Sequence, residues 1–304
     1  MKTLKKILAI IGVVLLTIIL GWAILLFWHY PHYQNKKEEV SFALPEDQSE
    51  LRVMSYNIRY LGPFDMGEKT WFYRADLVID TIEKATPTII GFQEVTCWQY
   101  DYLTETLVDF DSIITYRDEM VNSEGCPIFY RTDLYTLIDK GSFWLSETPD
   151  VMSKDWGSSH YRICSYVILK DNASGEEFVV FNAHLDHVSD EARINGIQVV
   201  LDKIDEFGGQ PAILMGDLNA EEYTDTYKSA TENFKDTKYE TENTMVSCTF
   251  QAWGEELDDD CIDYILVSPD AFEVEAYEVI HAIYDDVYAS DHFPLLSIMK
   301  LKEK

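Results

Sequence analysis

Apolar and polar positions along the chain predict a folded α/β domain that follows one long apolar helix. Short apolar runs rich in β-branched and aromatic residues recur throughout residues 51–304, and such runs are typical of strands. They are Leu51–Tyr56, Ile128–Tyr130, Tyr166–Leu169, Phe178–Asn182, Ala212–Met215, Tyr264–Val267 and Leu295–Met299. No repeat, low-complexity run or second linker divides residues 51–304, so we expect them to form one domain.

Helical spacing of apolar residues occurs between some of these predicted strands. It is clearest in Glu191–Phe207, where Ser189 can cap the start and the glycine pair at 208–209 stops the helix. Arg74–Ala85 and Trp98–Phe110 have a similar pattern. The domain is therefore predicted to be α/β, with more strands than helices.

The N-terminus predicts a membrane anchor in residues 1–28. Lys2, Lys5 and Lys6 precede an uncharged stretch, Ile7–Trp28, that is 22 residues long. About 20 apolar residues cross a bilayer as a helix, whereas the apolar region of a cleaved signal peptide is usually only about 7–15 residues long. No small-residue cleavage pattern follows the stretch, which favours a retained transmembrane helix over a signal peptide.

Flanking residues predict the orientation of this helix. The lysines nearest the membrane precede it, so the amino end should stay in the cytoplasm and the domain should be extracellular. Trp22, Trp28, Tyr30 and Tyr33 fit an aromatic belt at the outer interface. Residues 29–50, a polar segment with two prolines, are expected to form a linker that lifts the domain off the membrane. We therefore expect a single-pass protein of the cell membrane.

The charge balance narrows the possible functions. The chain has 54 Asp+Glu against 24 Lys+Arg, which gives a net charge of −30. Residues 1–50 contain equal numbers of lysines and acids, so the whole excess lies in residues 51–304. This acidity argues against a protein that grips nucleic acid through a basic surface, because phosphate affinity needs Lys and Arg. It does not exclude a metal-dependent enzyme, which uses cations to handle phosphate.

Polar residues of a few types stand at the ends of several predicted strands. They are Ser55–Asn57, Gln93-Glu94, Asn182–His187, Gly216–Asn219, Asp263 and Ser290–His292. Asp217 and Asn219 are two positions apart, so both project from one face if the strand continues.

Hydrolysis of a phosphate ester needs the two kinds of group that these motifs supply. Oxygen ligands suit Mg²⁺, Mn²⁺ or Ca²⁺, which neutralise the charge that develops on phosphorus, and the chain offers Asn57, Glu94, Asp217 and Asp291. Imidazoles move protons near neutral pH when a carboxylate orients them, and the chain offers His184 and His292.

These motifs, in this order, resemble those of the endonuclease/exonuclease/phosphatase superfamily. The resemblance covers about residues 50–301, and the stretch FNAHLDH followed by SDEAR is most similar to a bacterial, membrane-anchored subgroup with poorly defined substrates. It implies that residues 51–304 form the catalytic domain. The implied fold is a four-layer αββα sandwich, with two mixed sheets face to face, helices outside and the site at one end of the sheets.

The resemblance also implies a role for each matched residue. Glu94 corresponds to the principal metal ligand, with Asn57 beside it and Asp291 close enough to share the ion or hold a second one. Asp217 and Asn219 correspond to the residues that orient the attacking water and bind the scissile phosphate, and Asp217 is also a candidate metal ligand.

Histidines and their partners are matched in the same way. His292 corresponds to the histidine that contacts phosphate or acts as acid or base, and Asp263 to the aspartate that orients it. His184 corresponds to a second histidine, whose acidic partner in the family lies seven residues before an arginine. Glu124 has that spacing in the stretch EGCPIFYR, and Arg162 in HYRICSYVIL resembles a phosphate-contacting arginine.

Each signal has a simpler interpretation when taken alone. Asp217 to Asn219 could be a turn, and Asp291-His292 could lie in a surface loop. The conjunction of five separated motifs, each at the end of an apolar run, favours the catalytic interpretation. Asp186 and His187 can equally line a substrate pocket or make local hydrogen bonds. The acidic cluster within residues 255–260 is predicted to be a solvated loop rather than a calcium site.

The expected function is a divalent-metal-dependent phosphoesterase that uses in-line attack by water, with Mg²⁺ as the expected cofactor and Mn²⁺ or Ca²⁺ as alternatives. The preferred activity is that of a nuclease. The alternative is a phosphodiesterase that acts on lipid head groups, sphingomyelin or inositol phosphates. The substrate is thus a phosphate ester in nucleic acid or a lipid head group, the membrane is contacted through the N-terminal helix, and no protein partner is predicted. A non-catalytic binding module is disfavoured because no metal or histidine position is missing.

Overall fold

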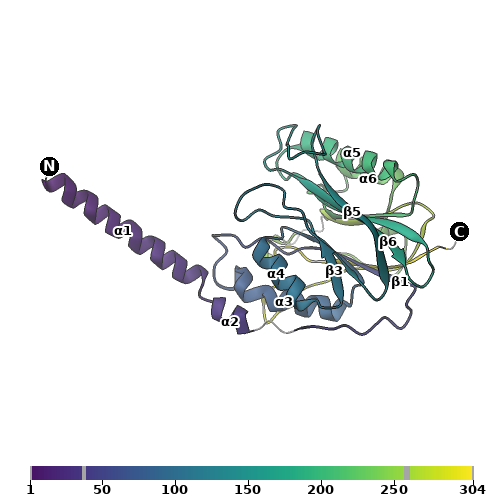
Figure 1. Ribbon diagram of the computed structural model, residues 1–304, viewed down its shortest axis with the longest axis horizontal. Helices are drawn as coiled ribbons and strands as arrows, with labels where there is room; N and C mark the ends of the chain where they lie inside the picture. The colour runs from purple at the N-terminus through teal and green to yellow at the C-terminus, as the bar shows by residue number, and fades with distance from the viewer. Residues whose placement is uncertain (1, 36–38, 257–260, 303–304) are drawn as a thin grey trace.

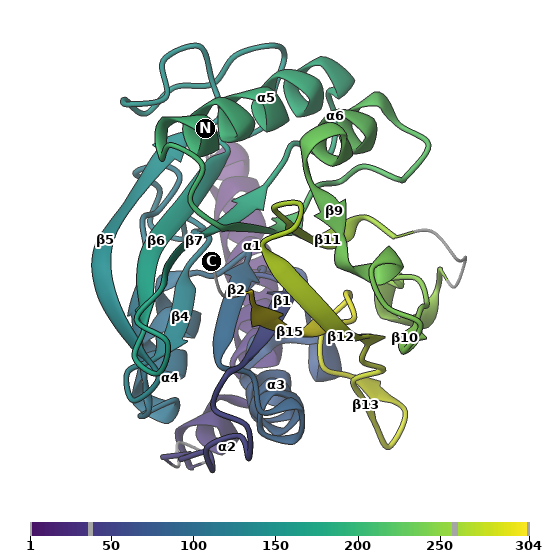
Figure 2. The same ribbon diagram turned by 90° about the vertical axis from the view of Figure 1, so that its right-hand side faces the viewer.

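Two mixed sheets pack face to face and helices cover their outer faces (Figures 1 and 2). The computed structural model describes residues 2–35, 39–256 and 261–302, so the lysines at 36 and 37 and the acidic residues at 258–260 lie outside the described residues. The four-layer αββα sandwich that the sequence predicts is confirmed.

Among the described residues, the first sheet has seven strands in the order β10-β12-β15-β1-β2-β4-β3. They are β1 (Glu50–Asn57), β2 (Ile89–Gln93), β3 (Phe110–Ile113), β4 (Ile128–Arg131), β10 (Thr244–Met245), β12 (Phe272–Val279) and β15 (Leu295–Leu301). The central strands β1 and β2 are parallel, in a register that sets Asn57 opposite Gln93. Their carboxyl ends therefore reach the same edge of the sheet.

The second sheet has six strands in the described part of the chain, in the order β5-β6-β7-β8-β11-β9. They are β5 (Tyr135–Trp144), β6 (Ile163–Asp171), β7 (Glu177–His184), β8 (Ala212–Asp217), β9 (Lys235–Asp236) and β11 (Asp263–Val267). Parallel pairing of β7 with β8 sets His184 opposite Asp217, and antiparallel pairing of β11 with β8 sets Asp263 opposite the same residue. A small hairpin of β13 (Ile283–Tyr284) and β14 (Val287–Tyr288) stands apart.

The structure has helices of two kinds: some cover the outer faces of the two sheets, and others belong to the N-terminal segment. The helices are α1 (Lys2–Leu26), α2 (Tyr30–Asn35), α3 (Trp71–Ala85), α4 (Cys97–Thr106), α5 (Asp190–Glu206) and α6 (Asp225–Asn233), with short 3₁₀ turns at Gly67–Lys69, Thr237–Tyr239 and Ala252–Gly254. α3 and α4 bury apolar residues against the first sheet, and α5 and α6 do so against the second. The predicted cap of α5 is present, because Ser189 Oγ accepts a hydrogen bond from the Ala192 N–H at 3.2 Å.

Side-chain hydrogen bonds join the two sheets near the carboxyl ends of β2 and β7. The side-chain amide of Asn182 on β7 donates to the carbonyls of Phe92 and Pro127 at 2.7 and 2.9 Å, and Gln93 Nε2 donates to Asn182 Oδ1 at 2.7 Å. Gly91 permits this close approach, since a Cβ there would meet Met215 and Asn182 at less than 3 Å. The positions of the strand ends in one sheet are thereby fixed relative to those in the other.

The N-terminal helix projects from one end of the molecule (Figure 1). The helical stretch Leu4–Gln34 is long and apolar enough to cross a membrane. Within the segment 29–50, which is expected to be a polar linker, two described aromatic residues pack on the domain: Tyr33 is buried and stacks on Tyr102 at 5.1 Å, and Phe42 is buried as well. The reason is that these aromatic side chains join the apolar cluster to which α3 and α4 contribute.

Candidate active site

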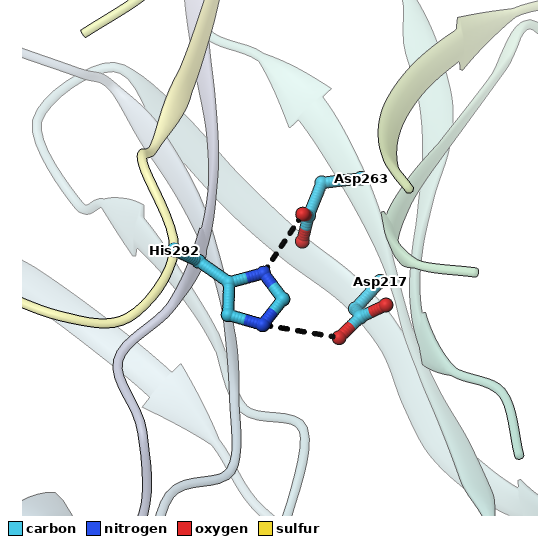
Figure 3. A group of neighbouring side chains, drawn as sticks. All are labelled: Asp217, Asp263 and His292. Atoms are coloured by element: carbon cyan, nitrogen blue, oxygen red, sulfur yellow. Dashed lines mark hydrogen bonds and ion pairs between the residues drawn. The ribbon is translucent and has the colours of Figure 1, made fainter. Parts of the chain in front are cut away.

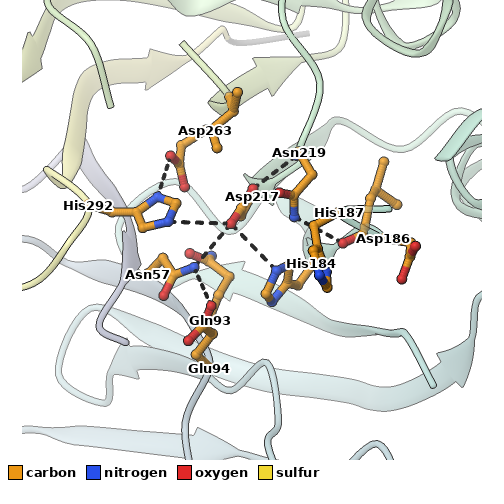
Figure 4. Close-up of polar contacts among 12 residues, drawn as sticks. Asn57, Gln93, Glu94, His184, Asp186, His187, Asp217, Asn219, Asp263 and His292 are labelled. Atoms are coloured by element: carbon orange, nitrogen blue, oxygen red, sulfur yellow. Dashed lines mark hydrogen bonds and ion pairs between the residues drawn. The ribbon is translucent and has the colours of Figure 1, made fainter. Parts of the chain in front are cut away.

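The strand ends bring the predicted residues together at one end of the sandwich (Figure 4). Asn57 and Glu94 come from the carboxyl ends of β1 and β2, and His184 and Asp217 from those of β7 and β8. Ligand sites form outside the carboxyl ends of parallel strands because side chains from several strands converge there. The others lie at the same end: Asn219, Asp263, Asp291 and His292.

A buried arginine from α3 holds two of these segments in place. Arg74 is fully buried, and its guanidinium donates to the carbonyls of Ile58 and Arg59 after β1 and of Ala289 before the Ser290–His292 turn, at 2.5, 2.6 and 3.1 Å. Three charge-assisted hydrogen bonds from one planar group fix both segments against each other. The sequence gives no sign of this role, because Arg74 lies in an ordinary amphipathic helix.

Asp217 stands at the centre of the site. Its Oδ2 accepts a hydrogen bond from the Asn57 side-chain amide at 3.0 Å, and its Oδ1 accepts one from the Asn219 backbone N–H at 2.9 Å. His184 Nε2 and His292 Nε2 lie 3.5 and 3.8 Å from Oδ2. Burial, followed by the charge of Asp263, raises the pKa of Asp217 to about 7. This carboxyl can therefore take up or release a proton near neutral pH.

His292 contacts Asp263, the residue to which the family resemblance assigns its orientation (Figure 3). Its Nδ1 lies 2.9 Å from Asp263 Oδ2, which leaves Nε2 directed at Asp217. Burial opposes the charge of the ring, but Asp263, Asp217 and Asp291 outweigh it and raise the pKa of His292 to about 10. Ligand atoms of His292, Asp217 and Asp263 lie within 4.8 Å of one another. Since the hydrogen bond to Asp263 occupies Nδ1, this trio is better suited to holding a proton than to holding a metal.

Glu94 and Asp291 supply oxygen ligands beside Asp217. Glu94 accepts hydrogen bonds from the Asn57 amide at 3.2 Å and the Tyr60 N–H at 3.1 Å, and Asp291 lies 3.5 Å from Arg59. Burial raises the pKa of Asp291. Burial also opposes the charge of Glu94, but Arg59 and His292 prevail and lower its pKa. Buried carboxylates that face one pocket fit a divalent cation, because its charge offsets the cost of ionising them together.

Backbone conformation at the site is unusual. Glu94, Asn219 and Arg59 have φ angles of 62°, 48° and 54°, in the left-handed region that non-glycine residues rarely adopt. Gly216, which precedes Asp217, has φ 146°, and a Cβ there would lie 1.9 Å from the Ala183 carbonyl oxygen. Strained residues cluster where surrounding structure holds functional groups in place, which supports a catalytic role for this end.

A cluster of basic residues lines the same pocket. We call Glu94, Asp217, Asp291 and His292 the acidic wall, and Arg117, His160, Arg162, His184 and His187 the basic wall. Burial, then the charges of Arg162 and Arg117, lower the pKa of His184, so its ring is neutral where that of His292 is charged. The two matched histidines therefore offer different chemistry.

Asp186 organises the basic wall. Its Oδ1 accepts hydrogen bonds from Ser159 N and Oγ at 3.0 and 2.6 Å and lies 3.4 Å from Arg162 Nε, and its Oδ2 accepts from Val188 N at 3.0 Å. Arg162 in turn contacts His187 Nδ1 at 2.9 Å. Of the two interpretations left open by the sequence, Asp186 follows the local one and His187 lines the pocket.

Glu124 has a different partner from the expected one. Its carboxylate forms two contacts of 2.7 Å with Arg117, and within the described residues no hydrogen bond joins it to His184. Arg117 lies next to Glu124 because the backbones of these two residues pair beside Gly125. Its planar guanidinium can bind both oxygens of a carboxylate, whereas a histidine can bind only one. Burial, then Glu94, raise the pKa of Glu124 to about 7.

Both walls line a pocket of about 760 Å³. Asn57 and Asp263 do not line it but stand behind Asp217 and His292, which they hold. The pocket also contains residues that the sequence did not single out: Arg59, Tyr60, Arg117, Asn122, His160 and Phe250. They come from loops, and their only signal in the sequence is that Arg59 and Tyr60 follow Asn57 closely.

Carboxylates that fit a divalent cation, an acid–histidine pair and a cationic wall define a site of the kind that metal-dependent phosphoester hydrolases use. The chain belongs to the Endonuclease/Exonuclease/phosphatase family, whose model matches residues 54–292. Members of this family depend on divalent metal ions and hydrolyse phosphate esters, and they include nucleases and phosphatases.

Solved bacterial structures resemble this chain over nearly their whole length. An endonuclease/exonuclease/phosphatase from Bacteroides vulgatus is 34% identical, with a TM-score of 0.79, and the alignment covers 83% of this chain and 99% of that one. A mannosyl-6-phosphatase from Bacteroides thetaiotaomicron is 32% identical, with a TM-score of 0.77, and the alignment covers 82% of this chain and 99% of that one.

Sequence relatives are matched over smaller shares. The CCR4-Not complex 3'-5'-exoribonuclease subunit Ccr4 of Mycosarcoma maydis is 27% identical over 202 residues, which are 55% of this chain and 29% of that protein. An uncharacterized protein of Acanthamoeba polyphaga mimivirus is 30% identical over 162 residues, which are 50% of this chain and 60% of that protein.

Proposed function

We propose that the protein is a Mg²⁺-dependent phosphatase that removes a terminal phosphate from a small phosphorylated substrate such as a sugar phosphate. The single observation that carries this proposal is that the acidic and basic walls line one pocket. A terminal phosphate carries about two negative charges near neutral pH, whereas a bridging diester carries one. A metal at one wall and two arginines at the other match the more highly charged group.

The chain's own residues divide the work of hydrolysis. Asp217, whose pKa is raised to about 7 by burial and by Asp263, orients the attacking water and accepts its proton. Asn57 and the backbone of Asn219 hold that carboxylate by hydrogen bonds. His292, kept cationic by Asp263, binds a phosphoryl oxygen and can protonate the leaving oxygen.

Arg162 binds the oxygens of the phosphate, and Asp186 holds the arginine in place. His184, neutral in this surrounding, accepts a hydrogen bond from the substrate or donates one to it. Glu94 and Asp291 would hold the divalent cation, with Asp217 beside them. The cation supplies charge neutralisation on the phosphoryl oxygens. Mg²⁺ is the expected ion because all these ligands are hard oxygens.

The residues that flank the apolar helix support a location for the enzyme. The lysines before the apolar helix favour a cytoplasmic amino end, so we place the catalytic domain outside the cytoplasm, anchored through α1. The chain is similar to the mannosyl-6-phosphatase over 99% of the length of that enzyme. This similarity supports a phosphorylated sugar as the substrate.

A substrate panel tests this function. The full chain in detergent, with Mg²⁺, would be given mannose 6-phosphate and other phosphate monoesters, bis-p-nitrophenyl phosphate, single-stranded RNA and DNA, inositol phosphates and sphingomyelin, with Asp217→Ala as the blank. We expect kcat/KM for a sugar monoester to exceed that for any diester by at least about 100-fold, the discrimination that about 2.7 kcal/mol of charge matching gives. Hydrolysis confined to diesters would overturn the proposal.

A nuclease is the second candidate. The exoribonuclease relatives favour it, and so does the ring of Phe250, which lines the pocket 5.0 Å from the ring of His292 and is placed to stack on a base. This candidate predicts shortening of single-stranded RNA in the same panel. It also predicts that Phe250→Ala lowers RNA hydrolysis more than monoester hydrolysis.

A further inference from the structure

Two loops at the mouth of the pocket expose large apolar side chains. Phe64 is 83% exposed, Met120 74% and Val121 99%. We call these three residues the apolar rim. Single exposed apolar residues are normal on a protein surface, but grouped ones mark a contact surface. The loops are joined, because the Asn122 amide donates to the Leu61 carbonyl at 2.9 Å.

The rim is tied to the membrane helix. The indole N–H of Trp22 in α1 donates to the carbonyl of Pro63 at 2.9 Å, and Phe64 is the next residue. The end of α1 packs on the domain as well: Leu26 is buried, and the ring of Phe27 lies 5.5 Å from that of Phe72 in α3. These contacts fix the position of the loops at the pocket mouth relative to α1.

Trp22 also sets the depth of these loops relative to a bilayer. It lies 15 residues after Ile7, the first residue of the uncharged stretch, which corresponds to about 22 Å along a helix. A hydrocarbon core is about 30 Å thick, so a helix that enters it at Ile7 places Trp22 in its outer half, about 8 Å inside the outer boundary. Phe64, next to the residue that Trp22 contacts, reaches the same level.

We propose that the apolar rim inserts into the outer face of the bilayer, so that the active-site pocket opens at the lipid surface. The occupant of the rim is lipid, because α1, which contacts Pro63 next to Phe64, is the helix that we propose to span the membrane. This contact does not depend on which ester the enzyme hydrolyses. It changes the expected geometry of access, since substrates would reach the pocket from the membrane plane.

The chemistry of the rim indicates uncharged lipid. Residues 118 and 119, next to Met120, are both acidic, and no lysine or arginine lies within 118–123 or 61–66. Anionic head groups would be repelled, and the gain comes from burial of apolar surface. Insertion should therefore be insensitive to salt, unlike a contact made by basic residues.

Spin labels on a matched pair of methionines test the proposal. The full chain, with Cys97→Ser to remove its half-buried cysteine, would be placed in phosphatidylcholine nanodiscs as Met120→Cys or as Met245→Cys. Met245 is 59% exposed and lies on β10 at the outer edge of the first sheet (Figure 2). The measurement is the accessibility of each label to oxygen, which concentrates in lipid, and to a water-soluble nickel chelate.

We expect the oxygen-to-nickel accessibility ratio at position 120 to exceed that at position 245 by at least about fivefold, in both dilute buffer and about 1 M NaCl, because an apolar contact is not screened. Adding Val121→Lys should lower the ratio at position 120 at least about threefold, since a lysine resists burial in lipid. Equal ratios at the two positions would overturn the proposal, as would loss of the difference in salt or no response to Val121→Lys. Low access of both reagents at position 120 would mean protein covers the rim, and would overturn it too.

Discussion

The two walls of the pocket contain the same residue type in opposite states. His292, among the acids of the acidic wall, has its pKa raised to about 10, because Asp263, Asp217 and Asp291 outweigh the effect of burial. His184, beside Arg162 and Arg117 of the basic wall, has its pKa lowered, first by burial and then by these charges. Neighbouring charges, not residue identity, thus decide which histidine carries a proton.

The same contrast explains how a chain of net charge −30 can handle phosphate. The excess acid is spread over residues 51–304, yet Arg162 is buried and Arg117 half-buried at the pocket, where water screens their charges less than at the surface. The carboxylates in the same pocket fit a divalent cation. Composition therefore excludes a broad basic surface, whereas a local cationic wall is compatible with it.

Breaking the acidic wall should have the largest effect. We expect Asp217→Ala or His292→Ala to lower kcat by about 10³–10⁴-fold, because each removes a group that acts only as the proton and charge move. Chelation of the metal should reduce hydrolysis as far, and Mg²⁺ should restore it. Rates of phosphate release measure all three.

Asp225→Ala is the control for these variants, since Asp225 is an exposed acid at the start of α6, and its activity should match the wild type. Asp263→Ala combined with His292→Ala should be no slower than His292→Ala alone, because the two residues act as a unit. Full activity in EDTA would contradict the metal-dependent mechanism.

The protonation states of the two histidines can be read directly. In protein held in EDTA, nitrogen NMR of the imidazoles should show His292 doubly protonated at pH 8 and His184 neutral at pH 6, as the raised pKa of the first and the lowered pKa of the second require. His184→Gln and His292→Gln assign the signals. Added Mg²⁺ should lower the pKa of His292, because a nearby cation offsets the carboxylates. Titration of both rings near the usual value would remove the distinction between the walls.

Weakening the basic wall should cost less than breaking the acidic one. Arg162→Ala is expected to lower kcat/KM for a monoester by about 100-fold, through loss of charge-assisted hydrogen bonds to the phosphate. Arg162→Lys should fall between, since it keeps the charge but loses the planar fork that contacts Asp186 and His187. Inhibition by inorganic phosphate should weaken in the same order.

Lys228→Ala, which removes an exposed cation from α6, controls for the loss of positive charge in general. If it lowered kcat/KM as much as Arg162→Ala does, the effect would come from long-range attraction and not from the wall.

The site residues at the strand ends were predictable from the sequence for a geometric reason. Asn57, Glu94, His184 and Asp217 follow parallel strands, whose carboxyl ends share an edge, so order along the chain is enough to bring them together. The helix over Glu191–Phe207 was equally accessible, because its apolar spacing and its cap are local signals.

The basic wall was only partly predictable, because it depends on loops. Arg162 was found by resemblance, but Arg117 and His160 lie in irregular segments without periodicity. Their positions are set by distant contacts, such as the hydrogen bond from the Trp144 indole to the Arg117 carbonyl at 2.8 Å. The pairing of Glu124 with Arg117 also escaped prediction, since spacing in the sequence does not say which cation is nearer.

At the N-terminus, the same limit appears in another form. The polar residues and two prolines in residues 29–50 predicted a linker, although Tyr33 and Phe42 in this segment pack on the domain. The aromatic partners of these two residues lie in α3, α4 and β3. Strand β5 was missed because most of its residues are exposed or half-buried, so it lacks an apolar run. In both cases the information lies in the tertiary partner.

The smallest expected effect separates the scaffold of the basic wall from its chemistry. Ser189 caps α5 through the Ala192 N–H and donates from its hydroxyl to the Trp156 carbonyl at 2.7 Å, but it does not line the pocket. We expect Ser189→Ala to lower the free energy of unfolding by about 1 kcal/mol, the usual worth of a cap, in urea denaturation. Because Asp186 still holds Arg162, kcat/KM should change by less than about threefold. Ser189→Thr should recover most of the stability, and a large loss of activity in Ser189→Ala would show that the wall depends on the helix start rather than on Asp186.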